Sequence, residues 1–291
     1  MNAGASPAGP PGAPDTVFFL SDYGLHDEFV GVVHAVLRRL APSAAVIDLT
    51  HEVPPFDIRA GAATLGRAWP HLGDGVVLAV VDPGVGGGRR GLVVEVGSTG
   101  GPRFLVGPDN GLLVPVAEAA GMVAAVELGA SAPDTSATFD GRDVFAPAVA
   151  DLCRGVPAAD LGPAVDPASL ERVPAPVVEP GTLPDGRLSL RVEVSWVDRF
   201  GNVQLAAAAE ALPSDVPVVV VRPDAGPWTA VVGANFAGDE PVPRVRAFAD
   251  LEPGMPGLLA DGNGHLALVV GQGSAAAHFG IGPGSLVQLM W

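Results

Sequence analysis

The sequence has one cysteine and few basic residues, and both shortages limit what the protein can be. Cys153 is the single cysteine among 291 residues, so no intrachain disulfide can form. It follows a mostly apolar, helix-like run at residues 144–152, which predicts a buried structural thiol rather than a nucleophile. Sixteen Lys and Arg oppose 32 Asp and Glu, for a formal net charge of −16. The chain therefore lacks the basic footprint of a nucleic-acid binder, and a small-molecule ligand is favoured.

Long apolar runs and closely spaced histidine pairs are also absent. No uninterrupted apolar stretch is long enough to span a bilayer, and the N-terminus lacks the pattern of a signal peptide. We therefore expect a cytoplasmic protein without membrane contact. The six histidines show no HExxH spacing and no close helical pairing, so we expect no metal site. His51-Glu52 is the best metal candidate among them and is interpreted as structural.

The ordered part of the chain divides into two predicted domains. Residues 1–14 are small and proline-rich and are expected to form a flexible tail. Residues 15–178 alternate apolar strand-like runs with helix-like segments, which predicts an α/β sandwich with a mainly parallel sheet covered on both faces. Residues 179–291 carry strand-like patterns separated by Gly, Pro and Asp turns, which predicts a smaller antiparallel β-barrel.

The expected elements follow from apolar periodicity. Strands are predicted at 17–20, 45–49, 76–81, 92–96, 103–106, 188–197, 203–205, 218–221, 228–232, 266–270 and 286–291. Helices are predicted at 28–40, 59–68, 112–120 and 144–152.

Four polar, glycine-containing loops are the candidate chemistry, and three of them directly follow an apolar strand. In the most informative loop, Asp82–Arg90, a carboxylate ends an unbroken apolar run, glycines open the backbone to a ligand, and two arginines close the loop. A tight turn with a surface ion pair is the alternative. A phosphate loop does not fit, because the lysine and the terminal Ser/Thr are missing. Of the other loops, Ser21–Gly24 could bind a sugar diol or form an Asx turn, and residues 107–111 are a turn by composition.

The fourth loop, at residues 138–147, places two acids and an arginine before the Cys153 helix. Asp143 could cap that helix and pair with Arg142, so the loop by itself does not require a catalytic function.

Taken together and in order, these loops resemble the S-adenosyl-L-methionine (SAM) hydroxide adenosyltransferases, relatives of the fluorinases and chlorinases. The matching segments are FLSDYG (19–24), DLTHEVPPFDIRAGA (48–62), DPGVGGGRR (82–90), GPDNG (107–111), TFDGRDVFAP (138–147), VDRFGNV (197–203) and GQGSAAAHFGIGPG (271–284). The resemblance implies that activated water attacks the ribose C5′ of SAM and gives adenosine and L-methionine. SAM is then the substrate, and neither a cofactor nor a metal is implied.

The resemblance places catalytic functions on Asp82, Arg89 and Asp140, with Arg90 a neighbour that could exchange with Arg89. The family carries histidine at the position of Asp140, and three interpretations of this change stay open. Asp140 could replace the histidine as base, because crowding against Asp82 raises one of the two carboxyl pKa values. It could instead orient water while Asp82 is the base. The site could also be slow, retaining binding with little turnover.

The matched segments also assign substrate contacts. Asp22 falls at the ribose hydroxyls, Phe56 near the sugar, Asp198 at the methionine amino group, Phe200 and Asn202 near adenine, and Gln272 and Gly273 at the base, while Asn110 and Phe139 lie within matched loops. The family forms trimers with sites between subunits, so a homotrimer is expected.

Two other functions remain in view. One is a noncatalytic adenosyl-ligand sensor, because a serine of the family's NSxGY-like turn is replaced by the segment Asp261–His265. The other is a halogenase, which the retained Asp82 disfavours, since halogenating relatives lack this carboxylate and carry tyrosine where Asp140 stands. A carboxylate about 4 Å from a halide costs about 4 kcal/mol at an effective dielectric of about 20.

Overall fold

The computed structural model describes residues 12–97, 103–129, 137–224 and 239–291. The chain divides into two compact units, Met1–Val173 and Pro174–Trp291. This division falls a few residues before the predicted border at 178/179, because strand β7 (Val178–Thr182) pairs with β8 (Leu188–Val197) and so belongs to the second unit. Most of the predicted tail, and the strand predicted at 228–232, lie outside the described residues.

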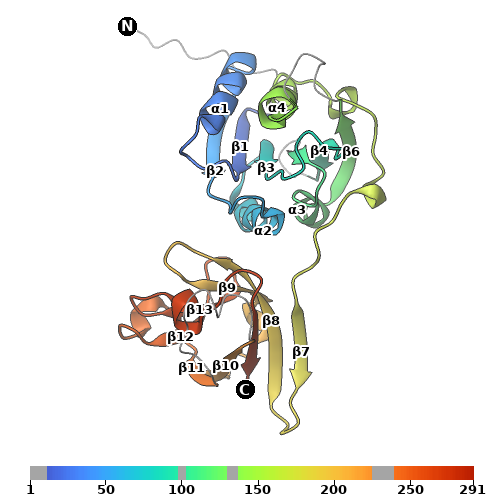
Figure 1. Ribbon diagram of the computed structural model, residues 1–291. Helices are drawn as coiled ribbons and strands as arrows, with labels where there is room; N and C mark the ends of the chain where they lie inside the picture. The colour runs from blue at the N-terminus through green and yellow to red at the C-terminus, as the bar shows by residue number, and fades with distance from the viewer. Residues whose placement is uncertain (1–11, 98–102, 130–136, 225–238) are drawn as a thin grey trace. The chain divides into compact units, whose positions relative to one another are not determined.

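The first unit is built on a six-stranded sheet of order β2-β1-β3-β5-β4-β6 (Figure 1). Its strands are β1 (Thr16–Ser21), β2 (Ala45–Thr50), β3 (Val76–Val80), β4 (Gly91–Val96), β5 (Arg103–Pro108) and β6 (Met122–Leu128). The pairs β1–β2, β1–β3 and β3–β5 are parallel. Strand β4 is antiparallel to both β5 and β6. Residues 97–102 are too few for a crossover connection, so β4 and β5 cannot be parallel neighbours. The predicted α/β domain is thus confirmed, with an antiparallel edge and the unpredicted strand β6 added.

In the described part of this unit, α-helices cover both faces of the sheet: α1 (Phe29–Leu40) and α4 (Ala146–Cys153) lie on one face, and α2 (Ile58–Ala68) and α3 (Val114–Ala119) on the other (Figure 1). Helix α1 buries Val33 and Leu37 at helical spacing, and Arg38 and Arg39 in its last turn complement the helix dipole. Helix α2 begins at Asp57, whose carboxylate accepts a hydrogen bond from the Ala60 N–H at 2.9 Å.

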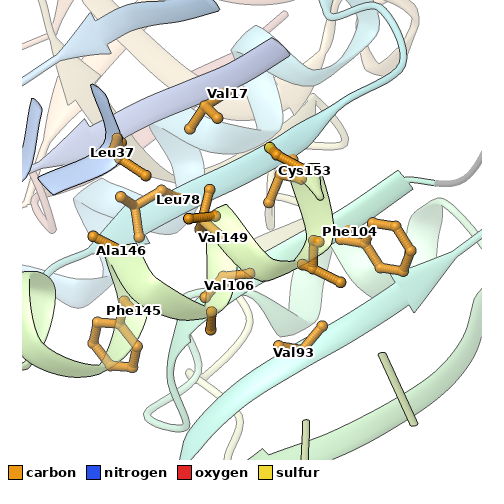
Figure 2. Close-up of a cluster of buried hydrophobic side chains, with 14 of the residues drawn as sticks. Val17, Leu37, Leu78, Val93, Phe104, Val106, Phe145, Ala146, Val149 and Cys153 are labelled. Atoms are coloured by element: carbon orange, nitrogen blue, oxygen red, sulfur yellow. The ribbon is translucent and has the colours of Figure 1, made fainter. Parts of the chain in front are cut away.

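The core between the sheet and α4 is apolar, with mainly aliphatic and some aromatic side chains (Figure 2). Val17, Leu78 and Val106 from three neighbouring strands meet Val149 of α4, and each is fully buried. Cys153 lies in this core as predicted, and burial raises the pKa of its thiol to about 12. A thiol in this state is a weak nucleophile at neutral pH.

The second unit is an eight-stranded, nearly closed antiparallel barrel of order β11-β10-β14-β8-β9-β13-β12, with β7 paired to β8. Its remaining strands are β9 (Val203–Ala208), β10 (Val218–Pro223), β11 (Glu240–Pro243), β12 (Pro256–Ala260), β13 (His265–Val270) and β14 (Leu286–Met290). The long strand β8 pairs first with β14 and then with β9, and a bridge from Arg244 to Leu258 joins the two end strands. The predicted barrel is confirmed.

Strands β7, β11 and β12 were not predicted, and each contains proline. Proline cannot donate to a strand ladder, so it is tolerated at such edge positions and hides them from sequence patterns.

The other helical elements among the described residues are short. They are α6 (Ala275–Phe279), the 3-10 turns η1 (Trp69–His71), η3 (Ala158–Asp160), η4 (Pro167–Ser169), η5 (Ala209–Ala211) and η6 (Phe248–Asp250), and the π-helical turn η2 (Gly141–Phe145). Among the described residues, no helix has the length and apolar character needed to cross a membrane.

Candidate active site

The candidate site lies where the neighbouring parallel strands β1 and β3 end. Ser21 of β1 is in register with Val80 of β3, and the Asp22 N–H donates to the Val80 carbonyl at 3.3 Å. The loops that follow these strands therefore start side by side and bring Asp22 and Asp82 to the same edge of the sheet. The carboxyl end of parallel strands is the usual place for a ligand in such a sheet.

Asp82, Arg89 and Asp140 form one charged cluster at this edge. Arg89 donates from Nε to both oxygens of Asp82, at 3.1 and 3.0 Å, and its Nη2 contacts Oδ2 of Asp82 and Oδ2 of Asp140. The side chains of Asp82, Arg89 and Asp140 are 6%, 15% and 11% exposed. The structure thus brings together the three residues predicted to be catalytic, with two carboxylates sharing one guanidinium.

The glycines of residues 84–88 allow this loop to return Arg89 to Asp82. Gly86 adopts a φ of +75°, and a Cβ placed there would lie 2.4 Å from the Ala137 carbonyl oxygen. Only glycine fits such a close backbone approach. The loop can therefore pack directly against the segment that leads to Asp140.

Asp140 is positioned by an irregular turn. It directly precedes the π-helical turn η2, a geometry that is rare and frequent at functional sites. Arg89 also lies over the Phe145 ring, 5.4 Å from its centroid. The second acid of this loop, Asp143, pairs with Arg142 instead, as the structural interpretation of the loop predicted. Only Asp140 of the two contacts Arg89.

A cavity of about 250 Å³ opens beside the cluster. It is lined by Asp22, Tyr23, Phe29, Pro55, Phe56, Val80, Asp82, Val85, Thr138, Phe139, Asp140 and Gly141. Tyr23, Phe29 and Phe139 contact one another edge-on or tilted, with ring centroids 5.3–5.8 Å apart. The cavity thus combines an aromatic wall with three carboxylates, a composition suited to a flat, polar and cationic small molecule.

Phe56 is the most unusual of these side chains. It is 72% exposed and adopts a φ of +69°, which is strained for a non-glycine residue. Its N–H donates to Oδ2 of Asp22 at 2.9 Å, so the strained residue and the predicted ribose-binding carboxylate are tied together. Strain of this kind concentrates at ligand-binding sites.

The electrostatics of the cavity follow from its burial. Burial raises the pKa of Asp22 above its usual value, and the nearby Asp82 adds to this, against the lowering effect of the Phe56 N–H. Burial also raises the pKa of Tyr23, with further contributions from Asp22 and Asp82. For Arg89, burial alone would lower the pKa, but hydrogen bonds to Asp82 and Asp140 outweigh it, and the guanidinium stays charged.

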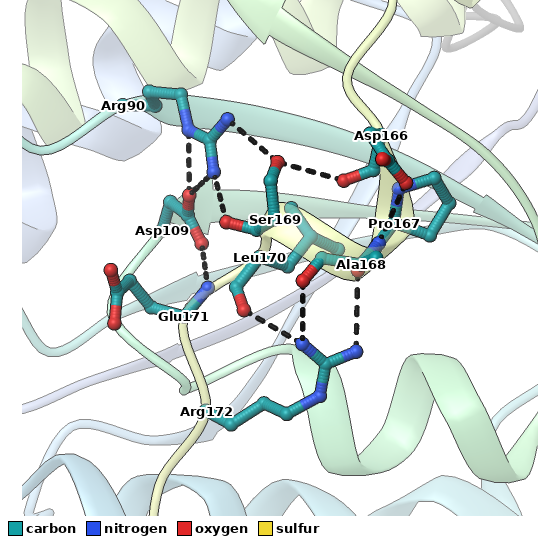
Figure 3. Close-up of polar contacts among 9 residues, drawn as sticks. All are labelled: Arg90, Asp109, Asp166, Pro167, Ala168, Ser169, Leu170, Glu171 and Arg172. Carbon is teal, nitrogen blue, oxygen red and sulfur yellow. Dashed lines mark hydrogen bonds and ion pairs between the residues drawn. The ribbon is translucent and has the colours of Figure 1, made fainter.

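Arg90 belongs to a separate network of structural contacts (Figure 3). Its Nε donates to Oδ2 of the buried Asp109 at 2.7 Å, and its Nη2 donates to the Ser169 carbonyl at 2.7 Å. The other oxygen of Asp109 accepts the Glu171 N–H at 3.0 Å. Arg90 therefore fastens the segment around η4 to the sheet, and Arg89 is the arginine of the pair that contacts the cavity-lining Asp82 and Asp140.

Asn110 is also engaged with the backbone. Its Nδ2 donates to the Val81 carbonyl at 2.8 Å, and its Oδ1 accepts the Leu112 N–H at 3.2 Å. It holds the end of β3 in place and does not line the cavity, so a substrate contact for Asn110 stays a prediction.

The second unit has its own cavity, of about 560 Å³, lined by Asp198, Phe200, Asn202, Phe248, Val270, Gln272 and Gly273. These lining residues include all five that were predicted to contact the substrate in this part of the chain. Asp198 organises the β8–β9 turn by accepting the Phe200 and Asn202 N–H groups, each at 2.9 Å. Phe200 is left 71% exposed, and Gln272 adopts a strained φ of +51°.

Several lining residues were missed by the sequence analysis. Tyr23 and Thr138 sit inside the quoted loops, next to Asp22 and Phe139, so their positions carried a usable signal. Phe29 begins helix α1, and Phe248 lies in a 3-10 turn outside any motif. Only tertiary packing brings these two to the cavities.

Sequence comparisons agree with this arrangement. The family model of the SAM hydroxide adenosyltransferase N-terminal domain matches residues 17–162, and that of the C-terminal domain matches residues 192–288. The chain belongs to the SAM hydroxide adenosyltransferase family. The resemblance drawn from the loops is therefore confirmed across both units.

The relatives of this chain include proteins named as SAM hydrolases and more distant ones named as fluorinases. A protein of Salinispora tropica named (R)-S-adenosyl-L-methionine hydrolase is 45% identical over 281 residues, covering 94% of this chain and 97% of the relative. One of the same name from Thermus thermophilus is 38% identical, covering 94% and 99%. A fluorinase of Actinoplanes is more distant, at 26% identity over 64% of this chain and 70% of the relative.

A solved structure has a similar fold. An uncharacterised conserved protein from Thermotoga maritima is similar with a TM-score of 0.80 at 31% identity, covering 94% of this chain and all of that chain.

Proposed function

We propose that this protein hydrolyses SAM to adenosine and L-methionine by attack of an activated water on the ribose C5′. The observation that carries the proposal is the Asp82–Arg89–Asp140 cluster, which lies against a cavity that also presents Asp22. Relatives at 38–46% identity over most of the chain, named for this hydrolysis, support it.

The chemistry asks little of the protein beyond water handling. The C5′–S bond breaks with its electron pair passing to sulfur, so the positive sulfonium becomes the neutral thioether of methionine. A C5′–O bond forms from water on the opposite side, and the water proton passes to a carboxylate. The protein must hold water in line with the C5′–S bond, accept its proton and exclude other nucleophiles.

The contacts of Arg89 suggest different functions for Asp82 and Asp140. Arg89 occupies both oxygens of Asp82 but contacts only Oδ2 of Asp140. The second oxygen of Asp140 is therefore better placed to accept the water proton, and Asp82 fixes Arg89 and contributes negative charge. In this assignment Asp140 replaces the histidine of the family as base.

The same charges disfavour a halide. Two ionised carboxylates against one guanidinium leave one negative charge beside the proposed water position. Each carboxylate about 4 Å from a halide costs about 4 kcal/mol at an effective dielectric of about 20, and Arg89 offsets only one of them. Water is neutral and is not excluded in this way. This favours hydrolysis over the halogenation named for the more distant relatives.

The substrate contacts follow the two cavities. Asp22 binds the ribose hydroxyls beside Phe56 in the first cavity, and Asp198, Asn202 and Gln272 of the second cavity bind the methionine and adenine ends. Contacts drawn from both units suit the homotrimer of the family, with sites between subunits. We extend the proposal to a cytoplasmic homotrimer, which light scattering coupled to size-exclusion chromatography tests.

The deciding experiment incubates purified protein with SAM, with and without chloride, and identifies products by chromatography. We expect adenosine and methionine in equal amounts and no 5′-chloro product. Asp140→Asn removes the proposed base and should lower kcat by about 10²- to 10⁴-fold, whereas Asp140→His should keep most of the activity. Asp143→Asn removes a neighbouring charge outside the cavity and is the matched control. Bound but unconsumed SAM with the unaltered protein would refute hydrolysis and support a sensor.

The sulfonium centre adds a second comparison. The relatives are named for the (R) form of SAM. With a mixture of the two sulfonium epimers, we therefore expect one epimer to be consumed and the other to remain in solution. Only one configuration places C5′ and the leaving sulfur in line with the water.

A further inference from the structure

Three metal-binding side chains converge on one face of the first unit, outside both cavities. His34 comes from helix α1, Asp48 from strand β2, and His51 from the residues just after β2. One ligand atom from each lies within 4.8 Å of the others. The two histidines are far apart in the sequence, so histidine spacing could not reveal this cluster.

Both histidines direct a ring nitrogen at the same carboxylate oxygen. The His34 Nε2 lies 2.9 Å from Oδ1 of Asp48, and the His51 Nε2 lies 3.0 Å from the same oxygen. Tetrahedral zinc with bonds of about 2.0–2.2 Å separates its ligand atoms by about 3.3–3.5 Å. Opening each contact by a few tenths of an ångström therefore makes room for an ion.

His51 is the member that most needs a partner. Its side chain is 2% exposed, and its Nε2 is buried without a hydrogen bond in acceptable geometry, even though Asp48 is near. Its other ring nitrogen, Nδ1, is 2.8 Å from the Ser21 hydroxyl, and the ring packs edge-on against Phe19 at 4.6 Å. The ring is thus fixed with Nε2 directed at the cluster, as outer hydrogen bonds fix metal-binding histidines.

We propose that His34, Asp48 and His51 form a binding site for a divalent transition-metal ion of the zinc type. Two imidazoles and one carboxylate suit such an ion, whereas Mg²⁺ and Ca²⁺ need mainly oxygen ligands. The side chains of His34 and Asp48 are 36% and 41% exposed, so the ion can enter from solvent and water can complete its coordination.

The position of this metal site gives it a structural function. The carbonyl of His51 accepts the Gly24 N–H at 2.7 Å, and Ser21 directly precedes Asp22 in the chain. An ion held by α1 and β2 therefore braces the loop that carries Asp22 and Tyr23 into the first cavity. It takes no part in the reaction proposed for that cavity.

Isothermal titration with ZnCl₂ tests the site, using metal-stripped protein without a histidine tag. We expect one saturable equivalent of Zn²⁺ and a higher melting temperature with Zn²⁺ than with Mg²⁺. His34→Ala and Asp48→Asn should each weaken binding by at least about tenfold, and Ser21→Ala by about 10- to 100-fold through the lost outer hydrogen bond. His71→Ala removes an exposed histidine elsewhere and should leave binding unchanged.

A visible absorption spectrum with Co²⁺ as the probe gives an independent readout, because imidazole coordination shifts the bands of the hydrated ion. His34 and Asp48 are partly exposed, so both variants should keep the fold, which circular dichroism checks. Absence of saturable Zn²⁺ binding would overturn the proposal, as would equal affinity in the unaltered protein and the His34→Ala and Asp48→Asn variants. Neither readout depends on SAM turnover, so this proposal can fail while hydrolysis stands.

Discussion

Replacing Asp82 with asparagine keeps the shape of the side chain and removes one negative charge from the cluster. Asp82 and Asp140 contact the same nitrogen of Arg89, and two charge-assisted contacts place their oxygens within about 6 Å. At 4–5 Å and an effective dielectric of about 20, two unit charges interact by about 3–4 kcal/mol. Loss of Asp82 should therefore remove about 3–4 kcal/mol of charge repulsion that favours transfer of the water proton to Asp140.

The same change should have two measurable consequences. Adenosine release from SAM should fall by about 10²- to 10⁴-fold, the range expected when general base catalysis is lost. The cost of placing a halide in the cavity should fall by about 3–4 kcal/mol, or several hundred-fold in affinity. Chloride should therefore inhibit the Asp82→Asn variant at concentrations that leave the unaltered protein active.

The assay is a chromatographic time course of adenosine formation over a range of chloride concentrations, with Asp143→Asn as a control for a charge lost nearby. Unchanged adenosine release by Asp82→Asn would remove Asp82 from the mechanism. A large loss of activity with no new chloride sensitivity would refute the electrostatic argument while leaving a positioning function for Asp82.

Three further predictions follow from neighbouring residues. Arg89→Ala and Arg90→Ala each leave buried aspartate side chains unpaired, so each should lower the free energy of unfolding by about 3–5 kcal/mol in chemical denaturation. Only Arg89→Ala should also abolish most turnover of the folded protein, because only Arg89 contacts Asp82 and Asp140. Asp22→Asn should weaken SAM binding yet raise stability at neutral pH, because folding raises the pKa of Asp22 and so disfavours its ionised form. In thermal melts this gain in stability should disappear as the pH falls below the ordinary aspartate pKa. A gain that is constant at all pH values would contradict the prediction. Gly141→Ala would place a Cβ 2.2 Å from the Tyr23 hydroxyl, so we expect stability to fall by about 1–3 kcal/mol and kcat to decrease. An unchanged melting temperature would show that the Tyr23 ring moves aside without cost.

Much of the fold follows from local patterns in the sequence. The apolar run at residues 76–81 and the helical spacing of residues 28–40 are visible because each buries a regular set of side chains. The elements that escaped prediction are edge strands such as β7, where proline and exposure on both faces remove the alternating pattern.

The candidate site was predictable to the extent that its residues lie in strand-end loops. Asp22 and Asp82 belong to two such loops, and the parallel pairing of β1 with β3 explains why they lie together, whereas Asp140 lies in the loop before η2 and α4. Phe29 and Phe248 had no such signal, because their place beside a cavity depends on how distant elements pack.

Local sequence was enough to predict an α/β domain followed by a barrel, the strand-end loops and the family, because these depend on periodicity and on residues close together in the chain. The tertiary structure was needed to show that Arg89 pairs with Asp82 and Asp140 beside the cavity while the adjacent Arg90 pairs with buried Asp109, since long-range partners select between neighbouring side chains. It also decided that His34 meets Asp48 and His51, because only the packing of helix α1 against strand β2 closes that distance.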